Sequence, residues 1–434
     1  MLALPIKFIK DAAKSVKRIC EQEFTKVADS VLTELLGISS LVVTMFTLRR
    51  EDDKDVLHLM CAHRRNIAIC PKCGAFTDSV HEEKKRCVRH LDIWGKKTFL
   101  HFLSRRFKCS DCGKQFTEEL DFVDQLRRQS LDFEMHIYRL CLSDNRKDVA
   151  NREELSQSTV KGIFLRYAKM RINPAHTKRC PRVLGIDEIS LKKRHRQFAL
   201  VLSDIERKCI LDILPERSKE ALEKWLDRFH EHERKSIRYV SIDMWQPYYH
   251  AVRGMLPKAE VVVDRFHVVK HLNERITVIR RKYQRDAPKE IAEVLKGSRW
   301  ILVRNRKDLS SKDEQKLKQI LEACPELRTI YLLKEEFRFI FERAKDRDKA
   351  EKYLRVWKLR AKYTGNSFLL KFVKTLENWW NEILNYFFEM ITNGFVEGLN
   401  GAIRSIIRRA FGYGNFENFR YQVMAEQNFP TNTR

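Results

Sequence analysis

Three acidic residues in this chain have the type and the local setting that phosphodiester chemistry needs. Asp187 and Asp243 each close a short apolar run of β type, and Glu397 lies in the first turn of an amphipathic helix. Carboxylates at strand ends and at a helix start can converge on hard divalent cations such as magnesium. Two such ions activate a water or hydroxyl and stabilise the leaving oxygen. The same residue types also form turns and cap helices, so each acid taken alone is weak evidence.

The overall charge indicates which class of molecule the protein binds. The 434 residues carry 85 Lys and Arg against 59 Asp and Glu, a formal net charge of +26. The natural partner of so basic a chain is a polyanion, and double-stranded DNA also suits metal-binding acids. A basic protein of membrane surfaces is the alternative, but no apolar run is long enough to span a bilayer. We expect no membrane association and no small-molecule substrate.

Cysteine usage bears on the compartment. Eleven cysteines in a chain of this length are too few for a disulfide scaffold, and no export signal is visible. We therefore expect a reducing compartment, with the cytoplasm as the default.

Two Cys-x-x-Cys pairs, each followed by Gly, are the strongest local signal. They are Cys70 with Cys73 and Cys109 with Cys112. Each pair offers two thiolates from one tight turn, and four thiolates saturate a tetrahedral zinc ion, which predicts a structural zinc ribbon at 61–120. A redox dithiol is the alternative for a single pair. Four other possible ligands lie nearby without paired spacing: Cys61, His63, Cys87 and His90. The role of residues 1–60 is not readable.

Two short amphipathic stretches after the ribbon fit a helix-turn-helix within 121–178, although other pairs of short helices can imitate this pattern. Its small core would consist of Val149, Ala150, Leu155, Val160 and Ile163. The second helix of such a motif meets bases and phosphates with its first residues. The contact residues that we predict are Gln157, Ser158, Thr159 and Lys161.

From residue 183 onward the pattern changes to three strands, a helix, a strand, a helix and a strand. The expected strands span 183–187, 197–203, 209–214, 237–242 and 259–263, and the expected helices span 218–230 and 247–255. This order is that of an RNase H-like fold, whose first part we place at 179–270. Because the first and fourth strands of that fold are neighbours, Asp187 and Asp243 should lie side by side. Glu188 should point to the opposite face of its strand and be structural.

The β character stops after Asp264. Residues 271–390 are almost wholly helical in pattern, and residues 270–310 contain twelve Lys or Arg against five acids. Such a run is either a solvated helix face or a basic surface that follows the DNA backbone, and we favour the second. This predicts an all-helical insertion with DNA contacts at Arg280 and Arg281.

The final block, 391–434, returns to the RNase H-like core and supplies its last helix, which begins near Glu397. Phe395, Leu399, Ile403, Ile406 and Ala410 recur at helical spacing and should face the interior. A different stripe carries Glu397, Asn400 and Arg404, at positions i, i+3 and i+7. We expect Arg404 and Arg408 to contact DNA.

The order of these motifs resembles one known family. The motifs are the two cysteine pairs with Arg105-Arg-Phe107 before the second, the helix-turn-helix, Gly185-Ile-Asp187-Glu188, Asp264-Arg-Phe-His267 and Thr392-Asn-Gly-Phe-Val-Glu397-Gly-Leu-Asn400. Over nearly its whole length the chain resembles transposases of the bacterial insertion-sequence family ISL-three (ISL3). The resemblance implies a DDE transposase that binds terminal inverted repeats, cuts there and joins the freed 3′ hydroxyl to target DNA.

The resemblance also implies the site residues and partners. The catalytic acids and ligands for magnesium or manganese would be Asp187, then Asp243 or Asp264, and Glu397. We take Asp243, because it follows the fourth strand. A supporting or alternative role falls to Asp264, His267 and Asn400. The partners would be transposon ends and target DNA, bound by a homodimer or higher oligomer at the bacterial nucleoid. A zinc-ribbon and helix-turn-helix regulator derived from a transposase is the alternative.

Overall fold

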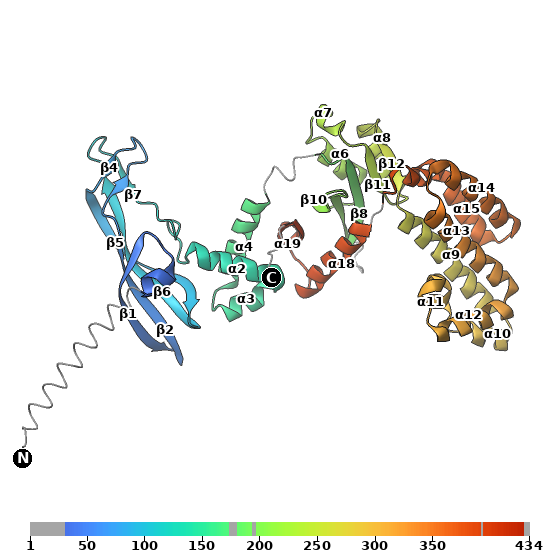
Figure 1. Ribbon diagram of the computed structural model, residues 1–434, viewed down its shortest axis with the longest axis horizontal. Coiled ribbons are helices and arrows are strands. Elements are labelled where there is room, and N and C mark those ends of the chain that lie inside the picture. The colour runs from blue at the N-terminus through green and yellow to red at the C-terminus, as the bar shows by residue number, and fades with distance from the viewer. Residues whose placement is uncertain (1–30, 173–179, 193–196, 392–393, 429–434) are drawn as a thin grey trace, which may run out of the picture. The chain divides into compact units, whose positions relative to one another are not determined.

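The computed structural model of the chain describes residues 31–172, 180–192, 197–391 and 394–428 (Figure 1). It consists of two compact units, Met1–Tyr167 and Ala168–Arg434, and each contains a five-stranded sheet. Several parts of the sequence interpretation lie outside the described residues: 1–30, 173–178 of the expected helix-turn-helix domain, 179 and 193–196 of the expected core, 392–393 of the last motif and 429–434 of the final block. Within the described ranges, none of the helices combines the length and the apolar character that crossing a bilayer requires.

Alternating apolar residues build the sheet of the first unit. Its order is β1-β2-β6-β5, with β7 beside β6, and the strands are β1 (Leu41–Glu51), β2 (Lys54–His63), β5 (Val80–Ile93), β6 (Lys96–Lys108) and β7 (Gln115–Thr117). β5 and β6 form a long antiparallel hairpin whose turn has positive φ at both Trp94 and Gly95, as a two-residue type I′ turn requires. One face of the sheet buries Leu57, Leu59 and Leu100 in the core.

A small hairpin and three helices complete the first unit. They are β3 (Ala68–Ile69), β4 (Phe76–Thr77), α2 (Leu131–Ser143), α3 (Arg146–Arg152) and α4 (Gln157–Arg171). α3 and α4 are the two helices expected of the helix-turn-helix. Four of the five predicted core residues are at most 1% exposed, whereas the fifth, Leu155, is half-buried in the turn. That turn holds Glu154 in the left-handed region, at φ 54°.

The sheet of the second unit has the order β10-β9-β8-β11-β12. The strands are β8 (Val183–Lys192), β9 (Gln197–Asp204), β10 (Cys209–Leu214), β11 (Tyr239–Ile242) and β12 (Glu260–Val263). β8, β11 and β12 are parallel neighbours, and β9 and β10 extend the sheet antiparallel on the other side. The predicted contact between the first and fourth strands is confirmed by the pairing of β8 with β11.

Two differences from the expected elements have local causes. β8 continues to Lys192 because it pairs with β9 along its whole second half, so Asp187 lies within this strand and not at its end. The helix expected at 218–230 is split into α6 (Lys219–Leu226) and α7 (Glu231–Arg234). The split occurs because the Glu233 carboxylate accepts from the His230 backbone N–H and starts a separate turn. α8 (Gln246–Met255) follows β11 and packs against α6.

The last helix, α19 (Phe416–Asn428), covers the edge strand β10. The Asn428 side chain accepts from the Ile210 backbone N–H at 2.9 Å and donates to the Ile210 carbonyl at 2.8 Å. Arg420 Nε donates at 2.7 Å to the carboxylate of Asp212, which is 1% exposed. An amide side chain thus replaces a further strand and blocks pairing at this edge.

Helices alone make up the chain between β12 and residue 391, as the sequence predicts. The largest is α9 (Arg265–Asp286), and around it pack α10 (Lys289–Val294), α11 (Arg299–Val303), α13 (Pro325–Arg343) and α15 (Ser367–Asn378) (Figure 1). The others are the 3-10 helix η2 (Arg306–Asp308) and the helices α12 (Ser311–Ala323), α14 (Arg347–Tyr363), α16 (Trp380–Leu384) and α17 (Tyr386–Glu389). α18 (Gly394–Arg409) then returns to the sheet and packs against β8.

Candidate active site

The register of the parallel strands sets three aspartates in a row. Val183 pairs with Tyr239 and Gly185 with Ser241 between β8 and β11, and Ile242 pairs with Val263 between β11 and β12. Continuing this register past the last paired residues places Asp243 between Asp187 and Asp264. Neighbouring strands lie about 4.8 Å apart, so the three carboxylates share one edge of the sheet. The expected proximity of Asp187 and Asp243 follows from this register.

Asp187 is half-buried, and two hydrogen bonds hold its carboxylate. Its Oδ2 accepts from the Asn400 side-chain amide at 2.8 Å, and its Oδ1 accepts from the Glu188 backbone N–H at 2.7 Å. Burial raises the pKa of Asp187 and the Asp243 charge raises it further, while the Glu188 N–H, the charge of His267 and the Asn400 amide lower it. Gly185 allows the close packing here, because a Cβ at this position would lie 2.5 Å from Ser203 Oγ.

The two candidates for the second aspartate differ in exposure. The Asp243 side chain is 51% exposed, accepts from the Met244 backbone N–H at 2.5 Å and lies 3.8 Å from His267 Nδ1. Asp264 is only 3% exposed and precedes α9, where its backbone carbonyl accepts from the His267 N–H at 3.1 Å. Asp243 therefore opens to solvent at the edge of the sheet, and Asp264 lies beneath the surface.

Glu397 reaches the same edge from the first turn of α18. The residue is exposed, in contrast to Val396 and Leu399, which face the core. Burial raises the pKa of Glu397, and the charges of Asp264 and Asp187 raise it further. Helix α18 thus brings Glu397 into the electrostatic field of the row. Two expected details are wrong: Phe395 is half-buried and Val396 takes its place in the core, and Ala410 is half-buried just beyond the end of α18.

Glu188 points away from this row, as strand alternation predicts. Its carboxylate accepts from the Tyr248 hydroxyl at 3.1 Å and pairs with Arg217 at 2.9 Å. The Arg217 guanidinium lies over the rings of both Phe198 and Trp245. Neither Tyr248 nor Arg217 was predicted from the sequence, because nothing in the local pattern of α8 or of the loop after β10 marks a residue that meets β8.

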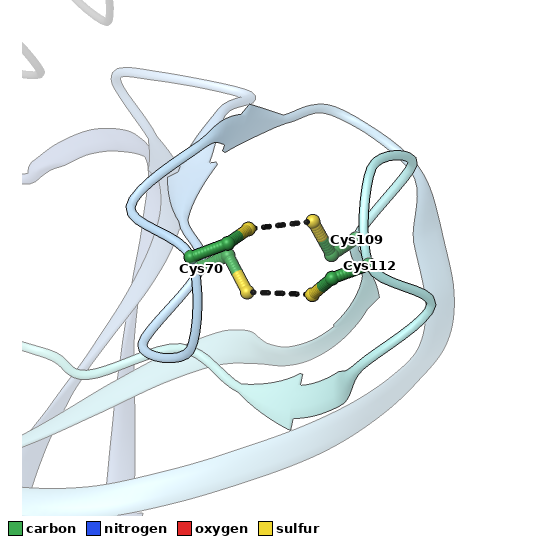
Figure 2. Close-up of side chains that lie close together, drawn as sticks. Cys70, Cys109 and Cys112 are labelled. Carbon is green, nitrogen blue, oxygen red and sulfur yellow. Dashed lines mark hydrogen bonds between the residues drawn. The ribbon is translucent and has the colours of Figure 1, made fainter.

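The four cysteines of the paired motifs form one cluster (Figure 2). Their sulfurs all lie within 4.8 Å of one another, with 3.6 Å between Cys70 and Cys112 and 3.5 Å between Cys73 and Cys109. A tetrahedral zinc–thiolate centre has sulfurs roughly 3.8 Å apart, so the set fits zinc. Burial raises the pKa of Cys70, but backbone hydrogen bonds from Cys73 and Lys72 and contacts with neighbouring thiols outweigh this and lower it to about 6.

The two cysteine turns have matching backbones. Cys70 N–H donates to the Ala75 carbonyl and Cys109 N–H to the Lys114 carbonyl, both at 2.9 Å. Gly74 and Gly113 follow with φ of 76° and 69°, a region that favours glycine. Among the described residues this is the only set of three or more potential ligands within 4.8 Å of each other, so the acids around Asp187 lie farther apart than the thiols.

Three family models match the chain in sequence. A model described as a transposase domain, named for the ISL3 family, matches residues 184–423, which is more than half of the chain. The zinc-finger of the transposases IS204, IS1001, IS1096 and IS1165 matches residues 68–112, and the helix-turn-helix domain of transposase family ISL3 matches residues 118–168. The chain belongs to the ISL3 family of transposases.

Curated relatives support this assignment along nearly the full length. The transposase for insertion sequence element IS1001 of Bordetella parapertussis is 30% identical over 391 residues, covering 88% of this chain and 94% of the relative. The transposase for insertion sequence element IS1557 of Mycobacterium tuberculosis is 28% identical over 413 residues, covering 87% and 91%. The protein is accordingly a DNA transposase with zinc-ribbon, helix-turn-helix and transposase domains.

The expected DNA contacts of this transposase are mostly on its surface. Ser156 caps α4 by accepting from the Thr159 N–H at 3.1 Å, so the predicted residues occupy its first turns. Of the expected contact residues on α4, Thr159 is half-buried and the other three are exposed: Gln157, Ser158 and Lys161. The expected contacts outside α4 that are exposed are Arg281, Arg404 and Arg408.

Arg280 is the exception among the expected DNA contacts. It is 9% exposed and donates from Nη1 to Gln284 and to the Leu295 carbonyl inside the helical body. It follows Leu272 and Ile276 at intervals of four, on the buried face of α9, which corrects its assignment as a DNA contact.

Proposed function

We propose that this transposase binds the terminal inverted repeats of its own insertion sequence, cuts the DNA there and joins the freed 3′ end to target DNA, using Asp187, Asp243 and Glu397. The strand order β10-β9-β8-β11-β12 supports an RNase H-like core, with α9 to α17 as a helical insertion before α18. The relatives are named as transposases for insertion sequence elements, which supports DNA ends as the substrate.

One hydrogen bond carries the proposal. The Asn400 amide meets Asp187 across 213 positions of sequence, and it ties the helix of Glu397 to the strand of Asp187. This contact adds a direct side-chain link to the packing of α18 against β8, which already brings the third acid near the first. Asn400 then positions Asp187, while Glu397 stays exposed one helical turn earlier.

The donor set fits hard cations. Carboxylate oxygens are the ligands that magnesium and manganese prefer, and the acids here raise the pKa of one another, which a bound cation would relieve. Such ions, when bound, supply the charge that activates the nucleophile and stabilises the leaving oxygen. Asp187, Asp243 and Glu397 would hold such ions, with the Asn400 amide fixing the orientation of the Asp187 carboxylate.

Asp243 is the second acid in this proposal. Its half-exposed carboxylate can reach a DNA phosphate, whereas Asp264 is buried and would act by supporting the position of His267. One observation favours the opposite choice, because Asp264 exerts the largest charge effect on the pKa of Glu397. A direct comparison of the two variants is therefore needed.

The test is cleavage and strand transfer of DNA that carries the element's ends, with magnesium or manganese. Asp187→Asn, Asp243→Asn and Glu397→Gln should each abolish both reactions and leave end binding nearly unchanged. Asp264→Asn should be milder, and Glu188→Gln is the matched control on the other face of β8. Cutting by Asp243→Asn but not by Asp264→Asn would exchange the two roles. Normal cutting by Glu397→Gln, or a protein that binds ends without cutting, would refute the proposal and favour a regulator.

A further inference from the structure

Large apolar side chains stay exposed on two neighbouring helices of the insertion, α13 and α14, which pack against each other. Their exposed fractions range from 49% to 95%, whereas the residues of α14 that face the core, such as Trp357 and Ala361, are fully buried. The two helices thus carry a second apolar surface, on the side away from the core. We call it the apolar face, and its residues are Leu332, Phe339, Tyr353, Val356, Leu359 and Tyr363.

One ion pair crosses the middle of the apolar face. The Glu336 carboxylate on α13 accepts from the Arg360 guanidinium on α14 at 2.6 Å. Only residues 344–346 join the two helices, so α13 and α14 run antiparallel as a helical hairpin. The apolar residues of the face therefore lie on both sides of this ion pair along the helices.

A projecting tyrosine and a hollow lie next to each other at one end of the apolar face. Tyr363 is 95% exposed, and it borders a hollow of about 1020 Å³ that Leu332, Leu359 and Phe368 also line. One surface thus offers both a projection and a recess of apolar character. A surface with both can be complementary to a second copy of itself.

The size of the apolar face fits a dimer. An aromatic side chain covers about 150–250 Å², so the exposed parts of Phe339, Tyr353 and Tyr363 together offer roughly 300–500 Å². The three aliphatic residues of the face add roughly 100–200 Å². A standard interface buries about 800 Å² per partner, and roughly 60% of that area is apolar, which is about 500 Å².

The charges beside the apolar face favour a protein over DNA as its partner. The cations of α14 that form an ion pair with a carboxylate of the same chain are Arg355, Lys358, Arg360 and Lys362. Such pairs leave little free positive charge for a phosphate backbone, whose contacts dominate the affinity for DNA. An apolar centre with a paired polar rim is instead the anatomy of an interface between proteins.

We propose that two copies of the chain associate through the apolar face, with α13 of each copy against α14 of the other. A two-fold axis parallel to the helices produces this arrangement, in which both copies use the same surface. Glu336 of each copy then lies beside Arg360 of the other, and apolar residues meet apolar residues. Packing α13 against α13 would instead bring two Glu336 carboxylates together. This inference does not depend on the proposed catalytic residues.

The first experiment measures self-association of the full-length protein by analytical ultracentrifugation without DNA. The wild type should be a dimer at micromolar concentration, and Leu359→Glu should raise the Kd of the dimer roughly 30-fold or more, because a charge would be buried among apolar residues. Trp300→Glu on α11 is the matched control and should leave the Kd unchanged, because Trp300 is similarly exposed but lies outside the apolar face.

Three results of this experiment would overturn the proposal. They are a monomeric wild type, a Leu359→Glu variant that associates as tightly as the wild type, and a Leu359→Glu variant that stays dimeric but loses binding to random duplex. The last result would assign the apolar face to DNA.

The second experiment exchanges the charges of the ion pair. Glu336→Arg and Arg360→Glu should each weaken self-association roughly tenfold or more, because like charges would face each other between the copies. An equimolar mixture should recover the wild-type affinity as a mixed dimer, since the introduced arginine of one chain meets the introduced glutamate of the other. A pair that acts only within one chain would give no recovery, and that result would overturn the arrangement. The mixture decides alone if Leu359→Glu loses its thermal unfolding transition.

Discussion

Replacing Asn400 by Ala removes the contact that joins the helix of Glu397 to Asp187. The amide donates to Asp187 Oδ2 at 2.8 Å, and the residue is 6% exposed, so water does not readily replace it. The Asn400 Oδ1 atom is buried and has no hydrogen-bond partner among the described residues. Within the described part of the chain, the Asp187 carboxylate is therefore the one hydrogen-bond partner of the Asn400 side chain. The substitution should therefore affect chiefly the position and charge of Asp187.

The size of the effect follows from the type of bond. A hydrogen bond to a charged group contributes about 1.5–3 kcal/mol. Since about 1.36 kcal/mol corresponds to a factor of ten in rate, Asn400→Ala should slow cleavage by roughly 10- to 150-fold. Asn400→Asp should be more severe at low magnesium, because a second carboxylate would face Asp187 in a partly buried site and the two could not both stay charged.

The assay is single-turnover cleavage of end-containing DNA over a range of magnesium concentrations, together with end binding and thermal unfolding. Asn400→Ala should need more magnesium and cut more slowly, with end binding unchanged. Ser405→Ala is the matched control on α18, because its hydroxyl bonds only within the helix, donating to the Gly401 carbonyl and accepting from the Arg408 guanidinium, and does not contact Asp187. If Asn400→Ala cuts within twofold of the wild type with the same magnesium dependence, the positioning role assigned to Asn400 is wrong.

Three further outcomes are expected. Cys73→Ser should lower the zinc content by about one ion per chain and make the ribbon sensitive to protease, while the second unit keeps its thermal transition; unchanged zinc content would count against the four-thiolate centre. In a fragment of residues 1–175, Gln157→Ala with Thr159→Ala should reduce the preference for the element's ends over random duplex, measured by competition binding; an unaltered preference would move recognition elsewhere. Arg281→Ala should weaken binding to all DNA and lower its salt dependence, whereas Arg280→Ala should lower the melting temperature, since Arg280 is buried; the reverse pattern would contradict the burial.

The elements around the active site were predictable because their signals are local. Apolar runs of four to six residues marked the strands, and the strand order of a familiar layout correctly predicted that β8 pairs with β11. The cysteine pairs, with glycine after each, likewise identified a cluster that the structure confirms. The strands and the cysteine pairs are each marked by a few adjacent residues, whereas the pairing of β8 with β11 came from the known layout.

The sequence could not show which face of a helix or strand a residue occupies where polar and apolar residues do not alternate regularly. Arg280 sits in a run of basic residues, yet it occupies the buried face of α9, which only the packing of the helical body determines. The contact of Glu188 with Tyr248 joins residues 60 positions apart and leaves no periodic trace.

The distance in sequence between Asp187 and Asn400 has a consequence during synthesis of the protein. The ribbon and the helix-turn-helix are complete by about residue 171, whereas Asp187 must wait another 213 residues for its partner. At roughly 5–20 residues per second, that interval lasts about 10–40 s. During this time a nascent chain has its zinc-ribbon and helix-turn-helix domains but not the proposed catalytic site. Translation thus separates completion of the zinc-ribbon and helix-turn-helix domains from completion of the proposed catalytic site, and a chain released early would carry the first without the second.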